Sequence, residues 1–144
     1  MEKTRLVFRK LKIYNNGNYF SKNSLPVSLR RPDSQMRYMI SKKSGLTKQL
    51  IDEPRIKEWK NWLLIDNAFP YDTAFKTSHI LIPKRVVTKD RLNKVELEEL
   101  NNVIDELSQK YDCYMVNFSR KQSIKAHFHI HFLIYYDNRE DCKI

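Results

Sequence analysis

Residues 126–134 read Ala126-His127-Phe128-His129-Ile130-His131-Phe132-Leu133-Ile134 and alternate between two kinds of side chain. In a β-strand, successive side chains point to opposite faces of the sheet. A strand here would place His127, His129 and His131 on one face, roughly 7 Å apart along the strand. The other face would carry the apolar side chains Ala126, Phe128, Ile130, Phe132 and Ile134. The pattern predicts a core strand that presents three imidazoles, and it contains all but one of the protein's 4 histidines.

The residues before this stretch predict a mixed α+β fold. Apolar runs cover residues 62–67 and 79–83, and a short one covers residues 114–117. Residues 90–110 carry apolar side chains at helical spacing opposite a polar face, with Asp90 as the expected N-cap. The order strand, strand, helix, strand, strand predicts an antiparallel sheet of about five strands with the helix 90–110 packed on it.

The N-terminal part gives weaker patterns. The chain has 144 residues, which is enough for one domain with a sizeable core. We predict a single domain over 1–144, with a basic N-terminal subregion at 1–58 and a core at 59–136. Within the subregion, residues 1–14 leave strand and helix open, residues 21–35 are typical of an irregular exposed segment, and residues 36–40 predict a short strand.

The charge balance favours anionic partners. Lysine and arginine total 27 against 17 acidic residues, which gives a net charge of +10 and a sequence pI of about 9.6. This favours nucleotides, nucleic acids or anionic surfaces, although a lysine-rich soluble surface explains it equally well. With only Gly17 and Gly45, the chain has no glycine-rich phosphate loop, which excludes the P-loop and dinucleotide fingerprints.

The cysteines and the hydropathy bear on the compartment. Cys113 and Cys142 form no CxxC pair, so no disulfide framework is expected. No apolar run is long enough to span a bilayer, and the N-terminus lacks a signal-peptide core. We expect an intracellular, cytoplasmic protein, with the nucleus also open, and no membrane partner.

Three hypotheses compete for the histidine row. The imidazoles could simply be hydrogen-bonded on a polar sheet face. Two histidines at i and i+2 could chelate zinc, with His79 or a carboxylate as a further ligand. One histidine could instead act on a phosphate as nucleophile or acid–base. Residues 119–125 favour the last hypothesis, because they hold Ser, Arg, Lys and Gln but no Asp, Glu or Cys, and such donors suit an oxyanion.

The stretch 127–133 resembles the signature of the histidine-triad (HIT) family, His-x-His-x-His followed by two apolar residues. Residues 64–67 and 78–84 resemble the family's strand, turn and "H-x-L-x-x-P" strand. The helix at 90–110, Asn117 and the "Q-S-V"-like Gln122-Ser123-Ile124 also match the family's order. The resemblance covers roughly residues 59–136 and implies a HIT-like α+β fold.

The resemblance also implies a set of residue roles. His129 would be the nucleophile of a nucleotidyl-histidine intermediate at an α-phosphate, and the other catalytic residues would be His127, His131 and His79. The implied phosphate-binding residues are Asn117, Ser123, Gln122 and Lys121. The implied nucleotide-binding residues are Asn67, Asp66, Leu64 and Ile65. No metal or other cofactor is expected, because histidines and cationic donors can carry the transition-state charge.

A third histidine at position 131 favours the hydrolase branches of the family. The substrates that this implies are a nucleoside phosphoramidate, a dinucleoside polyphosphate, a cap-like dinucleotide or a 5′-adenylylated DNA or RNA end. The resemblance also makes a homodimer plausible. The sequence departs from the family in lacking glycines before the triad, in the spacing from Ser123 to His127, and in a longer loop between Asn67 and His79, where residues 69–72 have no assigned role.

Two alternatives stay open. One is a nucleic-acid-binding module with a non-catalytic triad. Its basic residues would be those at 5–12, 30–31 and 42–43, and bases would stack on Tyr14, Tyr19, Phe20 and Tyr38. The other alternative is a His-ligated metal protein, for which stoichiometric zinc would be the signature.

Overall fold

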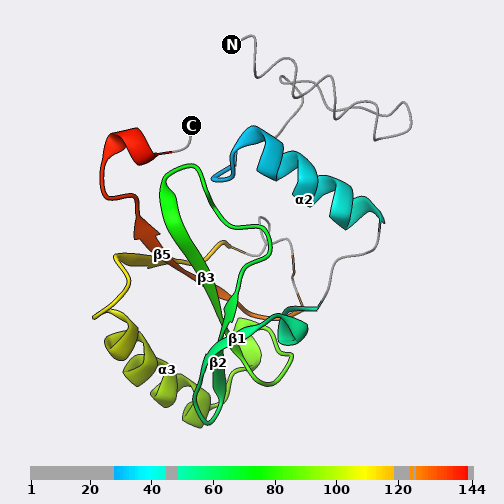
Figure 1. Cartoon of the computed structure of the whole chain (residues 1–144). Coiled ribbons are helices and arrows are strands. Elements are labelled where there is room, and N and C mark those ends of the chain that lie inside the picture. The colour runs from blue at the N-terminus through cyan, green and yellow to red at the C-terminus, as the bar shows by residue number, and fades with distance from the viewer. Residues whose placement is uncertain (1–27, 45–48, 119–123, 125, 143–144) are drawn as a thin grey trace.

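The fold is taken from a computed structural model that describes residues 28–44, 49–118, 124 and 126–142 (Figure 1). The sequence predictions for residues 1–14 and for the basic and aromatic positions before residue 28 lie outside these ranges. Lys121, Gln122 and Ser123 also lie outside them.

Five strands form one antiparallel sheet in the order β1-β2-β3-β5-β4 (Figure 1). The strands are β1 (Arg55–Glu58), β2 (Trp62–Asp66), β3 (Phe75–Pro83), β4 (Cys113–Met115) and β5 (Ile130–Tyr135). The long strands β3 and β5 pair in the middle of the sheet. The predicted α+β class with a five-stranded antiparallel sheet is confirmed.

The predicted helix is present but shorter, as α3 (Lys94–Leu107). Its N-cap is Asn93 rather than Asp90, because the Asn93 side chain accepts from the Glu96 backbone N–H and the Glu96 carboxylate accepts from the Asn93 N–H. Asp90 lies in a preceding 3-10 turn and accepts from the Thr88 hydroxyl. The reciprocal capping box fixes the start of α3.

The sheet has two differently covered faces. Against the α3 side lies a cluster of buried side chains comprising Trp62, Leu64, Leu81, Leu92, Val103, Leu107, Tyr111, Phe128, Ile130 and Phe132. On the other face, Leu50, Leu63, Ile65, Ile80 and Ile82 form a second, smaller cluster. The apolar alternation of the 126–134 stretch therefore does build core, on the α3 side.

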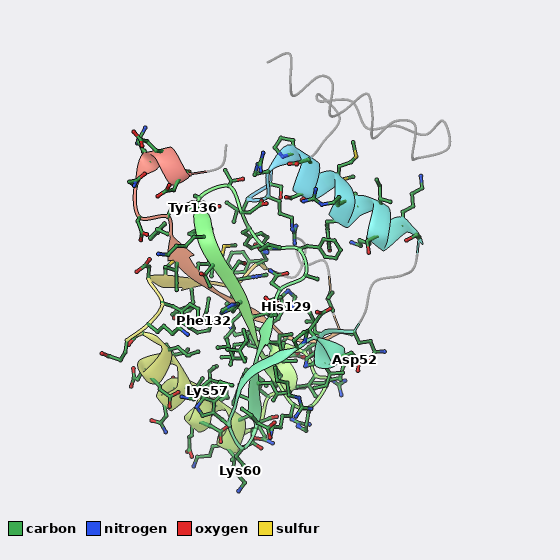
Figure 2. The ribbon with its side chains drawn as sticks, in the orientation of Figure 1. Asp52, Lys57, Lys60, His129, Phe132 and Tyr136 are labelled. Carbon is green, nitrogen blue, oxygen red and sulfur yellow. The ribbon has the colours of Figure 1, made fainter. Side chains whose placement is uncertain are left out.

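The predicted strand 126–134 begins later than expected. β5 starts at Ile130, so His127 and His129 precede it, and β4 ends at Met115 rather than at residue 117. The alternation nevertheless continues through the segment before β5, because Phe128 joins the α3-side cluster while His129 lies in a cavity on the other side. The labelled side chains His129 and Phe132 can be followed in Figure 2.

The N-terminal subregion contains a helix that the sequence pattern did not predict. α2 (Pro32–Ser44) replaces both the short strand expected at 36–40 and part of the irregular segment expected at 21–35. Pro32 opens the helix, Asp33 lies in its first turn, and Lys42 and Lys43 lie in its last turn, all of which suit a helix. The buried residues of α2 are Ser34, Gln35 and Met36, so the helix has no apolar stripe from which the sequence could predict it.

Candidate active site

Two of the three triad histidines line a cavity on the sheet face opposite α3. Its walls come from four parts of the chain that are distant in sequence: α2 with its approach, the segment before β1, the β2–β3 connection with β3, and the segments around β4 and β5. The lining residues are Arg30, Tyr38, Ser41, Leu50, Glu53, Asp66, Asn67, Ala68, Phe69, Tyr71, Ile80, Asn117, Ile124, His129 and His131.

The geometry around His129 fixes which ring nitrogen is reactive. Its Nδ1 lies 2.9 Å from the backbone oxygen of His127. Because a carbonyl oxygen only accepts hydrogen bonds, Nδ1 carries the proton and Nε2 keeps its lone pair. Burial of the ring is the main cause that lowers the pKa of His129 below its usual value, and the hydrogen bond to the His127 backbone offsets only part of this. His129 is therefore a neutral imidazole at pH 7 and can act as a nucleophile or base.

His131 is held by a tyrosine that is itself held by an asparagine. The Asn117 amide donates to the Tyr71 hydroxyl at 3.2 Å, and that hydroxyl lies 3.3 Å from Nε2 of His131. The amide takes one acceptor position of the Tyr71 hydroxyl, whose proton is available to Nε2 of His131. The rings of Tyr71 and His131 also pack with centroids 4.5 Å apart.

The charge state of His131 follows from its surroundings. Burial, and then the neighbouring His129 and Arg30, lower the pKa of His131 to about 3. The side chain is thus neutral throughout the physiological pH range. His131 can orient and hydrogen-bond a ligand, but it does not bring a positive charge to the cavity.

His127 has a positioning role rather than a place in the cavity wall. Its Nε2 donates to the backbone oxygen of Pro83 at 2.7 Å, and its ring is buried. This bond ties the segment before β5 to the end of β3. It also fixes the carbonyl of His127, which accepts from His129.

The structure does not bring His79 to this site. In the β3–β5 register, His79 pairs with Phe132 whereas Ile80 pairs with His131, so His79 lies on the α3 face. Its Nδ1 hydrogen-bonds to the Tyr111 hydroxyl at 2.5 Å. The sequence shows the reason: three residues separate His79 from Pro83, whereas the "H-x-L-x-x-P" motif has four, and a shift of one residue reverses the face.

Ser78 occupies the cavity-side position of β3 instead. It is buried, and its hydroxyl accepts from the Asn67 amide at 3.3 Å. Asn67, Asp66 and Asn117, all predicted for the site, do line the cavity. Of the predicted apolar pair, Leu64 packs in the α3-side cluster and Ile65 in the cluster of the other face, and neither lines the cavity.

The family resemblance did not predict the aromatic and cationic part of the cavity. Arg30 and Tyr38 come from the subregion outside the family resemblance, and Tyr71 comes from the loop to which no role was assigned. The neighbouring Asp72 explains how these parts are joined, since its carboxylate accepts from the Arg31 backbone N–H at 2.8 Å and from the Ser34 hydroxyl at 2.5 Å. The sequence signals were the unusual length of the loop and the places of Arg30 and Tyr38 among the basic and aromatic positions of the nucleic-acid-binding alternative.

The described residues bear on the two alternatives as well. Among them, no group of three His, Cys, Asp or Glu side chains is arranged to hold a metal ion. Within the same ranges, no helix is both long and apolar enough to cross a membrane. Of the basic and aromatic positions proposed for nucleic-acid stacking, Arg30 and Tyr38 belong to the cavity itself.

No family model and no curated protein matches the sequence. Solved structures that resemble the chain include a HIT family hydrolase from Legionella pneumophila Philadelphia 1, at 20% identity over 70% of this chain and 92% of that one, with a TM-score of 0.44. A histidine triad protein from Clostridium difficile matches at 12% identity (71% and 91% covered, TM-score 0.44). A HIT family hydrolase from Clostridium thermocellum matches at 17% (71% and 92% covered, TM-score 0.44).

These structures are HIT family or histidine triad proteins, and the sequence motif resembles the signature of that family. Their identities and TM-scores are too low to transfer an activity, so the functional argument rests on the residues of the cavity. Fold and site together define an α+β protein that presents two neutral histidines of a His-x-His-x-His motif to a cavity lined by aromatic and amide side chains.

Proposed function

We propose that this protein is a nucleotide hydrolase that acts at an α-phosphate through a nucleotidyl-histidine intermediate on His129. The observation that carries the proposal is the hydrogen bond from Nδ1 of His129 to the His127 carbonyl. It directs the free lone pair to Nε2 of a residue that lines the cavity, and burial keeps that residue neutral. A neutral imidazole is a competent nucleophile near pH 7.

The reaction has two displacements. In the first, Nε2 of His129 forms a bond to the α-phosphorus as the bond from phosphorus to the leaving group breaks, and the leaving group departs with the bonding electron pair. The proton on Nδ1 stays shared with the His127 carbonyl, which stabilises the charged ring. In the second, water attacks phosphorus and the N–P bond breaks. In sum, water supplies hydroxyl to phosphorus and a proton to the leaving group.

The cavity walls suit the other parts of a nucleotide. Asp66 and Asn67, at the end of β2, offer hydrogen-bonding groups for ribose hydroxyls, and apolar walls at Leu50, Ile80 and Ile124 offer a surface for a base. Asn117 would hydrogen-bond the phosphate. The proposed substrates are phosphoramidates, dinucleoside polyphosphates, cap-like dinucleotides and 5′-adenylylated nucleic-acid ends, with the net charge of +10 favouring the more anionic ones.

Hydrolysis in ¹⁸O-labelled water tests the position of attack. The purified protein is incubated with diadenosine tetraphosphate and with an adenosine phosphoramidate, and the products are analysed by mass spectrometry. We expect the label in AMP, because water attacks the α-phosphorus. Label in the other phosphate product of the tetraphosphate, or no turnover of any member of the substrate classes above, would contradict the proposal.

A further inference from the structure

Arg30 places a guanidinium group inside the cavity that holds the two histidines. Its central carbon lies 4.1 Å from the ring centroid of Tyr38 and 4.9 Å from that of Tyr71, which are cation–π distances. Its Nε donates to the Phe69 backbone oxygen at 2.7 Å, and one terminal nitrogen donates to the Gln35 side-chain oxygen at 3.2 Å. Two rings and two acceptors therefore hold the group in one orientation.

Nothing of opposite charge is paired with this cation in the described part of the chain. Arg30 makes no salt bridge there, whereas neighbouring Arg31 and Arg37 both approach Asp33. The nearby Asp72 is already occupied by the Arg31 backbone and Ser34. An arginine stays protonated even where burial lowers its pKa, as it does for Arg30. A partly buried cation with neutral partners is costly unless an anion joins it.

The Tyr71 side chain lies between Arg30 and His131 and contacts both. Tyr71 packs against the His131 ring on one hand and against the Arg30 guanidinium on the other. Burial, together with the neighbouring His129 and Arg30, keeps His131 neutral. The fixed positive charge on this side of the cavity therefore comes from Arg30, not from the third histidine.

We propose that Arg30 binds a phosphate group of the substrate and so makes the cavity selective for nucleotides over nucleosides. This inference rests on the proposed function for the identity of the substrate and deepens it by assigning the anion-binding residue. Phe69 and Gln35 take Nε and Nη1 of Arg30, which leaves Nη2 to donate to a phosphate. Charge-assisted bonds of this kind are roughly twice as strong as neutral ones. The residue comes from the N-terminal subregion, outside the part of the chain that resembles the HIT family.

Calorimetric titration with AMP and with adenosine tests the assignment without any need for turnover. We expect the wild type to bind AMP at least about tenfold more tightly than adenosine, since a charge-assisted contact is worth that much. Arg30→Gln should lose that preference while its affinity for adenosine stays within about twofold of the wild type. Arg30→Lys, which keeps the charge but not the fork, should retain part of it.

Arg37→Gln is the matched control, because it removes one positive charge from α2, the helix that follows Arg30, at an exposed position that does not line the cavity. It should leave the AMP preference unchanged. Equal weakening of AMP and adenosine in Arg30→Gln would mean that Arg30 only supports the fold, and an unchanged preference would place the anion elsewhere. Either result overturns the inference, as does a wild type without any preference for AMP. Phosphate-selective binding by a wild type that hydrolyses nothing would refute the proposed function alone.

Discussion

The two faces of the β3–β5 pair carry alternate residues of the same strands, and one face packs in the core whereas the other lines the cavity. On the α3 face, His79 stands opposite Phe132, and the neighbouring side chains form the main core. On the cavity face, Ile80 stands opposite His131, next to Tyr71 and His129. Because side chains alternate along a strand, a histidine's position in the alternation decides whether it faces the core or the cavity, where a ligand could bind.

The two histidines also differ in their partners. His79 is half-buried and bonds to Tyr111, a residue of the α3-side cluster, whereas His131 is buried and bonds to Tyr71 in the cavity wall. Burial lowers the pKa of both side chains. The comparison teaches that a shared strand and a shared residue type do not imply a shared role.

The largest effect that the comparison predicts is on catalysis. His129→Ala removes the proposed nucleophile, so kcat/KM for a hydrolysed nucleotide should fall by roughly 10⁴-fold. His79→Ala, on the other face, should change it by less than about tenfold. Steady-state kinetics on the same substrate measure both. If the two substitutions cost the same, the separation of the faces has no functional meaning.

The next effect is on stability and concerns the α3 face. Phe132 is 1% exposed and contacts Tyr111 and Tyr114 edgewise or at a tilt. Phe132→Ala should lower the free energy of unfolding by about 3–5 kcal/mol, as expected for a large side chain removed from a core. Val95→Ala, at an exposed position of α3, should change it by less than about 0.5 kcal/mol. Denaturant unfolding measures both, and a mild effect of Phe132→Ala would mean that the core lies elsewhere.

The third effect is a pH dependence that belongs to the cavity face. The pKa of His131 is about 3 in the folded chain against 6.5 for an ordinary histidine. The unfolded chain therefore binds a proton that the folded one does not, and stability is lost as pH falls below 6.5. The loss between there and about pH 5 should be about 2 kcal/mol.

His129 adds to this slope in the same direction, because its pKa is also lowered. His131→Gln should remove the part due to His131 and flatten the profile. Chemical denaturation at a series of pH values gives the slope for both proteins. An identical slope in the variant would show that His131 titrates normally.

The smallest effect tests the Tyr71 hydroxyl. Tyr71→Phe keeps the ring contacts with His131 and Arg30 but removes the hydroxyl's bonds to Nε2 of His131 and to the Asn117 amide. We expect a loss of about 1–2 kcal/mol in the free energy of unfolding, typical of two hydrogen bonds. The kcat/KM should drop about tenfold, because the His131 ring is no longer fixed. Tyr114→Phe, at an exposed ring outside the cavity, is the control and should show neither change.

The sequence predicted the parts of this picture that local periodicity carries. The order β2, β3, α3, β4, β5, the amphipathic α3 and the presence of His129 and His131 on one side all follow from alternation or helical spacing, whereas β1 was not predicted. The side on which His79 lies did not follow, because a motif match that is one residue short reverses the face of a strand.

The N-terminal contribution could not be predicted in the same way. α2 buries Ser34 and Gln35 through hydrogen bonds to Asp72 and Ser28 rather than through an apolar stripe. Hydrophobic periodicity therefore does not indicate this helix. The cluster of Arg30, Tyr38 and Tyr71 joins residues from α2, its approach and the β2–β3 loop. Only the folded chain brings these side chains together.

The most direct test of the central claim is the intact mass of the protein after brief exposure to an adenylyl or guanylyl donor that the protein hydrolyses. The reaction is quenched at alkaline pH, where phosphohistidine-type bonds last longest. We predict a nucleotidyl adduct on the wild type and on His79→Ala, and none on His129→Ala or His129→Gly. An adduct that persists without His129, or the absence of any adduct on a wild type that turns the donor over, would contradict covalent catalysis at His129.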